Sequence, residues 1–569
     1  MRITRITVIV LMLLTLVLFG LGARCYQLQQ IQAAEYADRA ANQRLLRTTR
    51  YPQRGAILDC RGRVLAASNR TQVIFADSVV IKDPNKTAME LATITGTHTM
   101  DIFDAIVRAD ALRPTIVDDA NVSQCEQATS MHGVGVESRW VRYYPTGRLM
   151  SNIVGFVSRP PFSRGLEGIE FQFDEQLSGT SASSVFFKDV HRRPIRPKEF
   201  EGRLRDGDGV LLTIDATVQK FARDELAARL KEYNAESATA IVAKPETGEI
   251  LAMVSLPDFE PTEASTADPN LFVSGAVIDT FEPGSIMKPI VMSIALDSGL
   301  VRHGETIFCE NGAYGGRGSG FGTIHEYREG FGELTPKGIL IKSSNIGMAK
   351  IGQRLGAERL YKGLRLLGFG KTVDIELPCA SRATGQLREP ELWNEYSVTR
   401  VPYGQEISVT ALQVIRAYCI LANEGRLVEP YLVKAIVDPD GRVVRRNEPA
   451  PPVGYIISPD VATWIIGEAM AAVVNEGTGK RAKLDRWQVF GKTGTANIYD
   501  PALGTYSKRD YVASFIAGAP AEDPEIVVLV SIRKPDRSLG KGYTGGRVAS
   551  PVAATIIEKT LTYLEKLGG

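Results

Sequence analysis

Hydrophobic and polar positions along this chain separate an N-terminal apolar segment from two folded parts. An uncharged apolar run covers residues 6–23. As an α-helix these residues span roughly 27 Å, close to the thickness of a bilayer core. Arg2 and Arg5 precede the run, and such basic residues stay on the cytoplasmic side. The pattern predicts a cytoplasmic tail at 1–5, a single-pass anchor of the cell (inner) membrane at 6–24, and export of everything after it.

A cleavable signal peptide is the alternative to a permanent anchor. The apolar part of a signal peptide is usually shorter and ends in a site of small residues. Gly20–Ala23 matches such a site poorly. Arg24 is a bulky charge before Cys25, where lipidation would need a small residue. We therefore expect an uncleaved anchor.

The segment after the anchor predicts a non-catalytic module. Residues 25–50 are rich in Gln, Ala and Arg, which favours a helix that leaves the membrane. Residues 54–66 predict a strand, a turn at Asp59–Gly62 and a second strand. The stretch from there to about residue 205 mixes short strands and helices and contains no evident catalytic cluster. We expect an elongated α+β pedestal module, similar to a dimerisation module, over 25–205.

A second unit begins at about residue 206. Its pattern predicts strands at 210–214, 238–243, 249–255, 511–517 and 525–532, and amphipathic helices at 218–230 and 551–567. A unit that begins and ends in strands, with helices between, fits an antiparallel sheet flanked by helices. The sequence therefore predicts an α+β domain over 206–569. The Gly-rich segment 312–332 suits a flexible surface loop, or alternatively a loop near a substrate groove.

Composition narrows the function classes. Hydrophobic residues make up 44% of the chain, and 67 basic residues nearly balance 65 acidic ones. The chain is therefore folded rather than disordered, and it gives no argument for nucleic-acid binding. Six cysteines without a C-x-x-C pair argue against a zinc ribbon or a redox motif but leave a single disulfide open. Five scattered histidines do not favour a Ser-His-Asp triad, and we expect no metal and no cofactor.

Three short motifs carry the chemistry. Ser285–Lys288 (Ser-x-x-Lys) comes first, Ser343–Asn345 (Ser-x-Asn) second and Lys492–Gly494 (Lys-Thr-Gly) third. Ser-x-x-Lys alone is a weak signal, because it recurs at 531–534 and at 538–541. The three motifs in this order are typical of active-site serine enzymes that react with penicillin. They indicate acyl transfer through a serine ester.

The first motif predicts a nucleophile and its base. Pro283–Gly284 is a turn signal, and the apolar run beyond Lys288 predicts a buried helix. Ser285 would lie at the helix N-terminus, where free N–H groups favour negative charge, with Lys288 one turn away. A desolvated lysine near another cation can activate a serine hydroxyl. An N-capping serine followed by a snorkelling lysine is the alternative, and the companion motifs disfavour it.

The other two motifs predict proton relay and substrate binding. Ser343 could pass a proton to the leaving group, and Asn345 could hold a substrate amide, although alone they would suit an ordinary helix cap. The third motif follows Val489–Gly491 and so lies on or beside a strand. Gly494 would let another backbone approach closely.

The third motif also offers contacts for an extended substrate. Lys492 with Thr493 or Thr495 could bind a carboxylate, and an extended substrate could pair along the strand. The backbone N–H groups of Ser285 and Thr495 are candidates for an oxyanion hole.

With these motifs the chain resembles a class B penicillin-binding protein, a monofunctional peptidoglycan D,D-transpeptidase, over nearly its whole length. Glu406 stands where such proteins often carry glycine. The context Phe281–Ser285 and the compact layout are more similar to the septal, cell-division members (FtsI type) than to the elongation type. Further segments that carry the resemblance are Arg54–Ala66, Arg142–Pro145, Gly155–Phe156, Gly165–Glu170, Tyr403–Gln405, Val409–Gln413 and Gly545–Pro551.

The resemblance implies a mechanism and partners. Ser285, activated by Lys288, attacks the penultimate D-Ala carbonyl of a stem peptide and expels the terminal D-Ala. The amine of a neighbouring peptide then resolves the acyl-enzyme into a cross-link, and β-lactams would acylate the same serine. The resemblance also implies a SEDS-type glycosyltransferase and divisome proteins as partners, contacted through the anchor and the N-terminal module. The catalytic domain would be periplasmic or extracellular.

Two rival functions fit the same motifs. A β-lactamase or DD-carboxypeptidase would need a base that activates water, and the sequence identifies none. A non-catalytic β-lactam sensor or divisome scaffold would carry a relic site, but all three motifs are intact.

Overall fold

The computed structural model describes residues 2–108, 113–158, 163–188, 194–327, 330–448, 454–500 and 504–568. The chain forms two compact units. One contains Met1–Gln53 with Gly179–Asp206, and the other contains Arg54–Ser178 with Gly207–Gly569.

The smaller unit combines the apolar helix with a short sheet. The continuous helical segment Thr4–Ile31 is 28 residues long and apolar enough to cross a membrane. Strands β1, β6 and β7 form a three-stranded antiparallel sheet with β6 in the middle. The elements of this unit are α1 (Arg2–Tyr26), a π-helical turn (Gln27–Ile31), α2 (Ala33–Arg44), β1 (Leu45–Arg50), β6 (Ala182–Lys188) and β7 (Pro194–Glu201).

The helix predicted over 25–50 is wrong for its last six residues. Helical structure ends at Arg44, and Leu45–Arg50 forms β1 instead. Each of these six residues pairs with a residue of β6, more than 130 positions later in the chain. Such long-range pairing overrides the local helix preference on which the prediction depended.

The larger unit is built on a five-stranded antiparallel sheet in the order β10-β9-β21-β20-β19. Its first hairpin comes early in the chain and the other three strands come late, as the apolar runs and the hairpin signal predicted. β19, which carries the third motif, is an edge strand of this sheet. The strands are β9 (Ser237–Ala243), β10 (Ile250–Leu256), β19 (Phe490–Asp500), β20 (Thr505–Ala519) and β21 (Ile526–Arg533).

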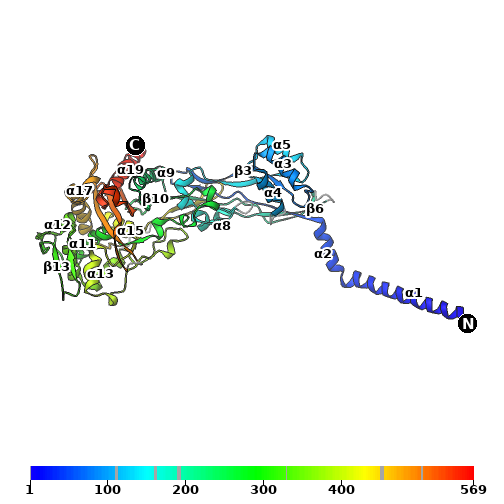
Figure 1. Cartoon of the computed structure of the whole chain (residues 1–569), viewed down its shortest axis with the longest axis horizontal. Coiled ribbons are helices and arrows are strands. Elements are labelled where there is room, and N and C mark those ends of the chain that lie inside the picture. The colour runs from blue at the N-terminus through cyan, green and yellow to red at the C-terminus, as the bar shows by residue number, and fades with distance from the viewer. Residues whose placement is uncertain are drawn as a thin grey trace. The chain divides into compact units, whose positions relative to one another are not determined.

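Helices cover both faces of this sheet. α9 (Ala216–Glu232) and α19 (Ser550–Gly568), the two amphipathic helices predicted here, lie side by side and share one hydrophobic cluster with the sheet (Figure 1). The opposite face shares a second cluster with α11 (Lys288–Asp297), α13 (Asn345–Leu366) and α15 (Ala411–Ala422). α15 is buried along its whole length. The predicted α+β class, with an antiparallel sheet between helices, is confirmed.

A second sheet has the strand order β18-β17-β8-β2-β3-β4, and β5 pairs with β3. The turn between β2 and β3 is the one predicted at Asp59–Gly62, and the Asp59 carboxylate accepts backbone N–H bonds from Arg61 and Arg63. The domain boundary predicted at 205/206 separates β2 from β8 along the chain. In the structure these two strands pair in parallel and belong to one compact unit. The strands are β2 (Ile57–Leu58), β3 (Val64–Ala76), β4 (Thr115–Val117), β5 (Val134–Tyr143), β8 (Gly209–Leu212), β17 (Val433–Val437) and β18 (Val443–Arg446).

Three segments that carry the family resemblance meet in one buried ion network. Glu170 is fully buried, and its two carboxylate oxygens accept hydrogen bonds from the Nε atoms of Arg54 and Arg142, each at 2.6 Å. Arg54 also pairs with Asp174 at 2.6 Å, and Arg142 donates to the Gly55 carbonyl at 2.8 Å. A buried carboxylate is tolerated only with such partners. The network therefore joins residues that are 28 to 120 positions apart in the chain.

Candidate active site

Ser285 lies in a short 3₁₀ turn, η5 (Gly284–Met287), that continues directly into α11. The reason is local. Pro289 has no N–H for the Ser285 carbonyl, which an α-helix would require, and the Lys288 N–H bonds to that carbonyl instead. Residues three apart are eclipsed in a 3₁₀ turn, so Ser285 and Lys288 share one side of it. Ser285 is half-buried, whereas Lys288 is fully buried.

Two buried contacts hold this turn from behind. The hydroxyl of Tyr418, inside α15, donates to the Ile286 carbonyl at 2.6 Å. The Gly284 N–H donates to the Gly404 carbonyl at 3.0 Å. Gly404 has φ 82°, and a Cβ there would come 2.1 Å from the Gly284 carbonyl oxygen, so only glycine fits. Gly284–Met287, called the nucleophile turn after the role that the sequence predicts for Ser285, is therefore held in place by contacts with α15 and with Gly404.

The third motif lies on β19 and packs against this turn. A Cβ on Gly494 would come 3.0 Å from both the Pro283 carbonyl oxygen and the Ile286 side chain. The absence of a side chain at Gly494 thus permits the close approach that the sequence predicted. β19 is an edge strand of the five-stranded sheet, and edge strands are where an extended peptide can add to a sheet.

The two threonines of this strand have hydroxyl partners. Thr493 Oγ1 lies 2.7 Å from Thr478 Oγ1, and Thr495 Oγ1 accepts the Gly545 N–H at 3.2 Å. Thr493 is buried and Thr495 half-buried. These contacts orient the hydroxyls beside the strand edge that faces the nucleophile turn.

The amines of the first and third motifs meet at the second motif. Lys288 Nζ donates to the Ser343 carbonyl at 2.6 Å and to Asn345 Oδ1 at 2.8 Å, and it lies 3.2 Å from Ser343 Oγ. Lys492 Nζ donates to Ser343 Oγ at 2.9 Å and to the Thr493 carbonyl at 3.1 Å. The structure therefore brings Lys288, Ser343, Asn345 and Lys492 into direct contact, one 3₁₀ turn from Ser285.

Burial decides the charge of these amines. Burial lowers the pKa of Lys288 to about 7, and the negative charge of Glu326 opposes the shift. Burial also lowers the pKa of Lys492 well below its usual value, and the positive charge of Lys288 lowers it further. Desolvation disfavours a charged amine, and two like charges in one site disfavour each other. A neutral amine on Lys288 is thus accessible near neutral pH.

The second motif lies in the tight loop that the sequence predicted. α12 (Pro336–Lys342) ends at Ser343, whose φ of 58° is left-handed. Ser344 then caps α13 by accepting the Gly347 N–H at 3.0 Å, and Asn345 is the first residue of that helix. The helix-cap alternative therefore describes Ser344, whereas Ser343 and Asn345 are turned toward Lys288.

Sequence reasoning missed Glu326, in the Gly-rich segment. The described part of this segment forms a small hairpin of β13 (Ala313–Gly315) and β14 (Thr323–His325); Arg328 and Glu329 lie outside the described residues. Glu326 follows β14, and its carboxylate accepts hydrogen bonds from Ser344 Oγ and from the Asn345 N–H. The Gly-rich segment therefore contacts the second motif through Glu326. No motif spacing marks Glu326, so only its contacts identify it.

Glu406 keeps the backbone conformation that glycine favours. Its φ is 58°, and its N–H donates to Glu282 Oε1 at 3.0 Å. Its carboxylate accepts hydrogen bonds from Arg388 and Ser397, each at 2.7 Å. Burial raises the pKa of Glu282, three residues before Ser285. Glu406 therefore combines a left-handed backbone with side-chain contacts that glycine could not make.

Buried Cys309 lies beside the second motif, with its sulfur 3.5 Å from Ser344 Oγ. No two of the six cysteines, all of which lie in the described part of the chain, are joined to each other, so the disulfide that the sequence left open is not formed. The thiol fills space behind the Ser343–Asn345 loop.

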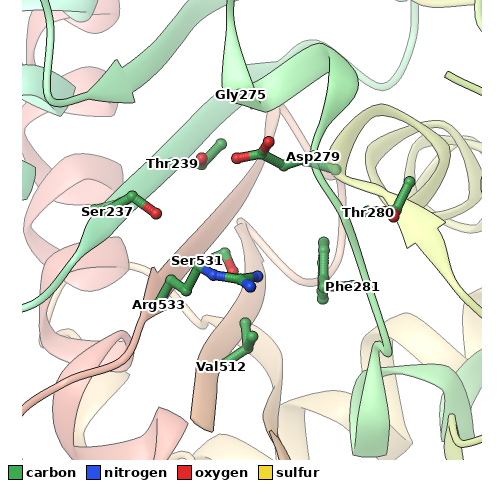
Figure 2. A pocket seen from close by; sticks show the side chains of 11 residues that line it. Ser237, Thr239, Gly275, Asp279, Thr280, Phe281, Val512, Ser531 and Arg533 are labelled. Atoms are coloured by element: carbon green, nitrogen blue, oxygen red, sulfur yellow. The ribbon is translucent and has the colours of Figure 1, made fainter. Parts of the chain in front are cut away.

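A small pocket lies next to the strand that leads into Ser285. Figure 2 shows Thr280 and Phe281 on one side of it, with Ser531 and Arg533 of β21 opposite. Its lining contains no residue of the three motifs. The pocket is therefore distinct from the cluster formed by Lys288, Ser343, Asn345 and Lys492.

The chain matches two family models. Residues 238–558, more than half of the chain, match the penicillin binding protein transpeptidase domain, and residues 49–212 match the penicillin-binding protein dimerisation domain. The chain belongs to the class B penicillin-binding proteins. As a member of this family it is a serine-type D-Ala-D-Ala transpeptidase. All three motifs lie within the matched transpeptidase domain.

Similar proteins and solved structures support the same family assignment. Stage V sporulation protein D of Bacillus subtilis is 30% identical, over 90% of this chain and 78% of the relative. The probable peptidoglycan D,D-transpeptidase PenA of Neisseria meningitidis is 28% identical, over 98% of this chain and 92% of the relative. The crystal structure of penicillin binding protein 3 of Mycobacterium tuberculosis with aztreonam has a TM-score of 0.70 at 25% identity, over 91% of this chain and 97% of that one.

Proposed function

We propose that this penicillin-binding protein cross-links peptidoglycan stem peptides during septal wall synthesis, through an ester on Ser285. The observation that carries the proposal is the convergence of Lys288, Asn345 and Lys492 on the Ser343 loop, one turn from a half-buried serine. This arrangement supplies a nucleophile, a desolvated base and donors for a peptide substrate, which acyl transfer requires.

The proposed acylation step begins with the Ser285 hydroxyl. Lys288 accepts its proton as the oxygen attacks the penultimate D-Ala carbonyl, and the N–H groups of Ser285 and Thr495 bind the developing oxyanion. The carbon–nitrogen bond to the terminal D-Ala then breaks, and Ser343 relays a proton to the departing nitrogen. Lys492, Thr493 and Thr495 bind the substrate carboxylate, and Asn345 binds a substrate amide. Gly494 keeps the strand close to the serine.

Deacylation returns the enzyme to its starting state. The amine of a neighbouring stem peptide attacks the ester carbonyl, a new amide bond forms, and the bond to Ser285 Oγ breaks. The serine oxygen regains a proton from the lysine and Ser343 pair, which in turn takes one from the attacking amine. A β-lactam acylates the same oxygen, but its leaving group remains tethered by the opened ring.

Covalent labelling tests the mechanism. The full-length protein in detergent is incubated with a fluorescent penicillin, alongside Ser285→Ala, and followed over hours. A stable label that the mutant lacks is the expected result. Label that forms and quickly disappears would indicate a β-lactamase, and label retained by Ser285→Ala would overturn the proposed nucleophile. Absence of label from both proteins would favour a scaffold or a site that a partner must open.

The septal role and the membrane topology are part of the same proposal. The context Phe281–Ser285 and relatives named for sporulation or as an FtsI homologue support a division role. Arg2 and Arg5 support a cytoplasmic N-terminus, with the catalytic domain periplasmic or extracellular. A SEDS-type glycosyltransferase and divisome proteins would be its partners. Filamentation after depletion, with a fluorescent fusion at midcell, is expected; loss of rod shape instead would indicate an elongation role.

A further inference from the structure

The carboxylate of Glu326 binds the N-terminus of α13 with both oxygens. Oε1 accepts hydrogen bonds from Ser344 Oγ at 2.5 Å and from the Ile346 N–H at 3.2 Å, and Oε2 accepts from the Asn345 N–H at 2.8 Å. The first N–H groups of a helix have no partner inside it, and a carboxylate there is favoured by the helix dipole. Glu326 thus fixes the backbone at the start of this 22-residue helix.

The neighbouring residue fixes the side chain of Asn345. The His325 carbonyl accepts from Asn345 Nδ2 at 3.0 Å, which leaves Oδ1 to accept from Lys288 Nζ at 2.8 Å. An amide held at both ends has one orientation only. The two-residue segment 325–326 therefore sets both the position and the direction of the Asn345 amide that Lys288 contacts.

Glu326 also acts on Lys288 through its charge. Burial lowers the pKa of Lys288 to about 7, and the negative charge of Glu326 opposes this shift. Lys492 faces the same amine from β19, and burial together with the charge of Lys288 lowers its pKa. The Cys309 thiol lies behind Ser344, and burial raises its pKa. Glu326 therefore contributes a negative charge near Lys288 and also contacts the second motif.

We propose that Glu326 is a positioning residue for acylation, holding the Asn345 amide and the Ser343 loop against the Lys288 amine. It acts through these residues and not on the reacting atoms. The inference rests on the proposed acyl-enzyme at Ser285. If this holds, the Gly-rich segment contributes to the catalytic site although it lies outside all three motifs.

The acylation rate as a function of pH tests this role. Glu326→Gln, Glu326→Asp and the unchanged full-length protein are mixed with a fluorescent penicillin from mildly acidic to mildly alkaline pH. Glu326→Gln should lower the plateau rate roughly ten- to hundred-fold, because the Asn345 amide and the Ser343 loop are displaced. It should also move the acidic limb of the profile to lower pH, since loss of the negative charge lowers the pKa of Lys288. Glu326→Asp should lower the plateau but leave the limb in place.

Controls separate this role from general damage. Glu333→Gln removes an exposed carboxylate from β15 (Glu333–Leu334), directly after the Gly-rich segment, and should leave both the plateau rate and the acidic limb unchanged. An unchanged plateau rate in Glu326→Gln would overturn the inference. A lower plateau rate with the acidic limb at its original pH would also overturn it. If Glu326→Gln does not fold in a thermal melt, Glu326→Asp decides: a normal plateau there would overturn it. Label retained by Ser285→Ala would instead overturn the proposed function.

Discussion

The side-chain nitrogens of Lys288 and Lys492 converge on one atom, Ser343 Oγ, at 3.2 and 2.9 Å. Both lysines are fully buried, and burial lowers the pKa of each. Two buried ammonium groups around one hydroxyl would repel each other without solvent to screen them. The two lysines therefore hold fewer protons in this site than they would carry in water.

The rate of acylation should depend on the protonation of Lys288. A base must be neutral to accept the Ser285 proton, and the pKa of Lys288 is lowered to about 7. The protonated fraction falls as pH rises, so the acylation rate should rise with pH through about 7 and then level off. Stopped-flow mixing with a chromogenic β-lactam across this range measures the profile. A rate that is independent of pH around neutrality would show that another group is the base.

Lys288→Met should lower the acylation rate but raise the stability of the fold near pH 7. Acylation should fall by roughly a thousand-fold, within the range for loss of a general base. The folded pKa of Lys288 lies below its unfolded value of 10.5, so the unfolded state binds more protons between about pH 7 and that value. The unchanged protein therefore gains stability as pH rises across this window.

The methionine variant lacks this dependence. It should melt at a higher temperature than the unchanged protein at pH 7, with a difference that shrinks at alkaline pH. Lys371→Met, at an exposed lysine, is the control and should not alter the pH dependence of melting. A Lys288→Met protein that melts lower at every pH would contradict the expectation.

Gly494→Ala should slow acylation more than it affects folding. A Cβ there meets the Pro283 carbonyl oxygen and the Ile286 side chain at 3.0 Å, so β19 and the nucleophile turn must move apart by a few tenths of an ångström. Misplacement near the reacting atoms costs about ten-fold or more in rate. Gly304→Ala, where nothing lies within 4 Å of the new atom, is the matched control. Equal acylation rates for the two variants would count against a close fit between strand and turn.

Glu170→Ala should destabilise the larger unit. Removing this buried carboxylate leaves Arg54 and Arg142, both buried, without their main partner. Breaking a buried ion pair from one side typically costs about 3–5 kcal/mol. Denaturant unfolding measures the loss, and Glu175→Ala, at an exposed position of α8 (Asp174–Ser178), should change little. Similar midpoints for both variants would contradict a structural role of the network.

Much of the larger unit could be predicted from local pattern. The hairpin β9–β10, strands β20 and β21, and the helices α9 and α19 have strong periodicity or turn signals, and all are found near their predicted positions. The sequence also predicted Ser285 at the start of a helix but not the 3₁₀ form of this turn, which the missing N–H of Pro289 explains. The strand at Leu45–Arg50 could not be predicted, since its partner lies more than 130 residues away.

The sequence by itself determined the three motifs, their order, the apolar N-terminal helix and the α+β class, because each depends on residue type and spacing. Only the tertiary structure decided that Lys288 and Lys492 meet at Ser343, that Glu326 caps the helix of Asn345, and that Arg54, Arg142 and Glu170 form one network. These contacts join segments 19 to 149 residues apart. Burial and the low polarity of the core, which set the lysine pKa values, arise only when those segments pack together.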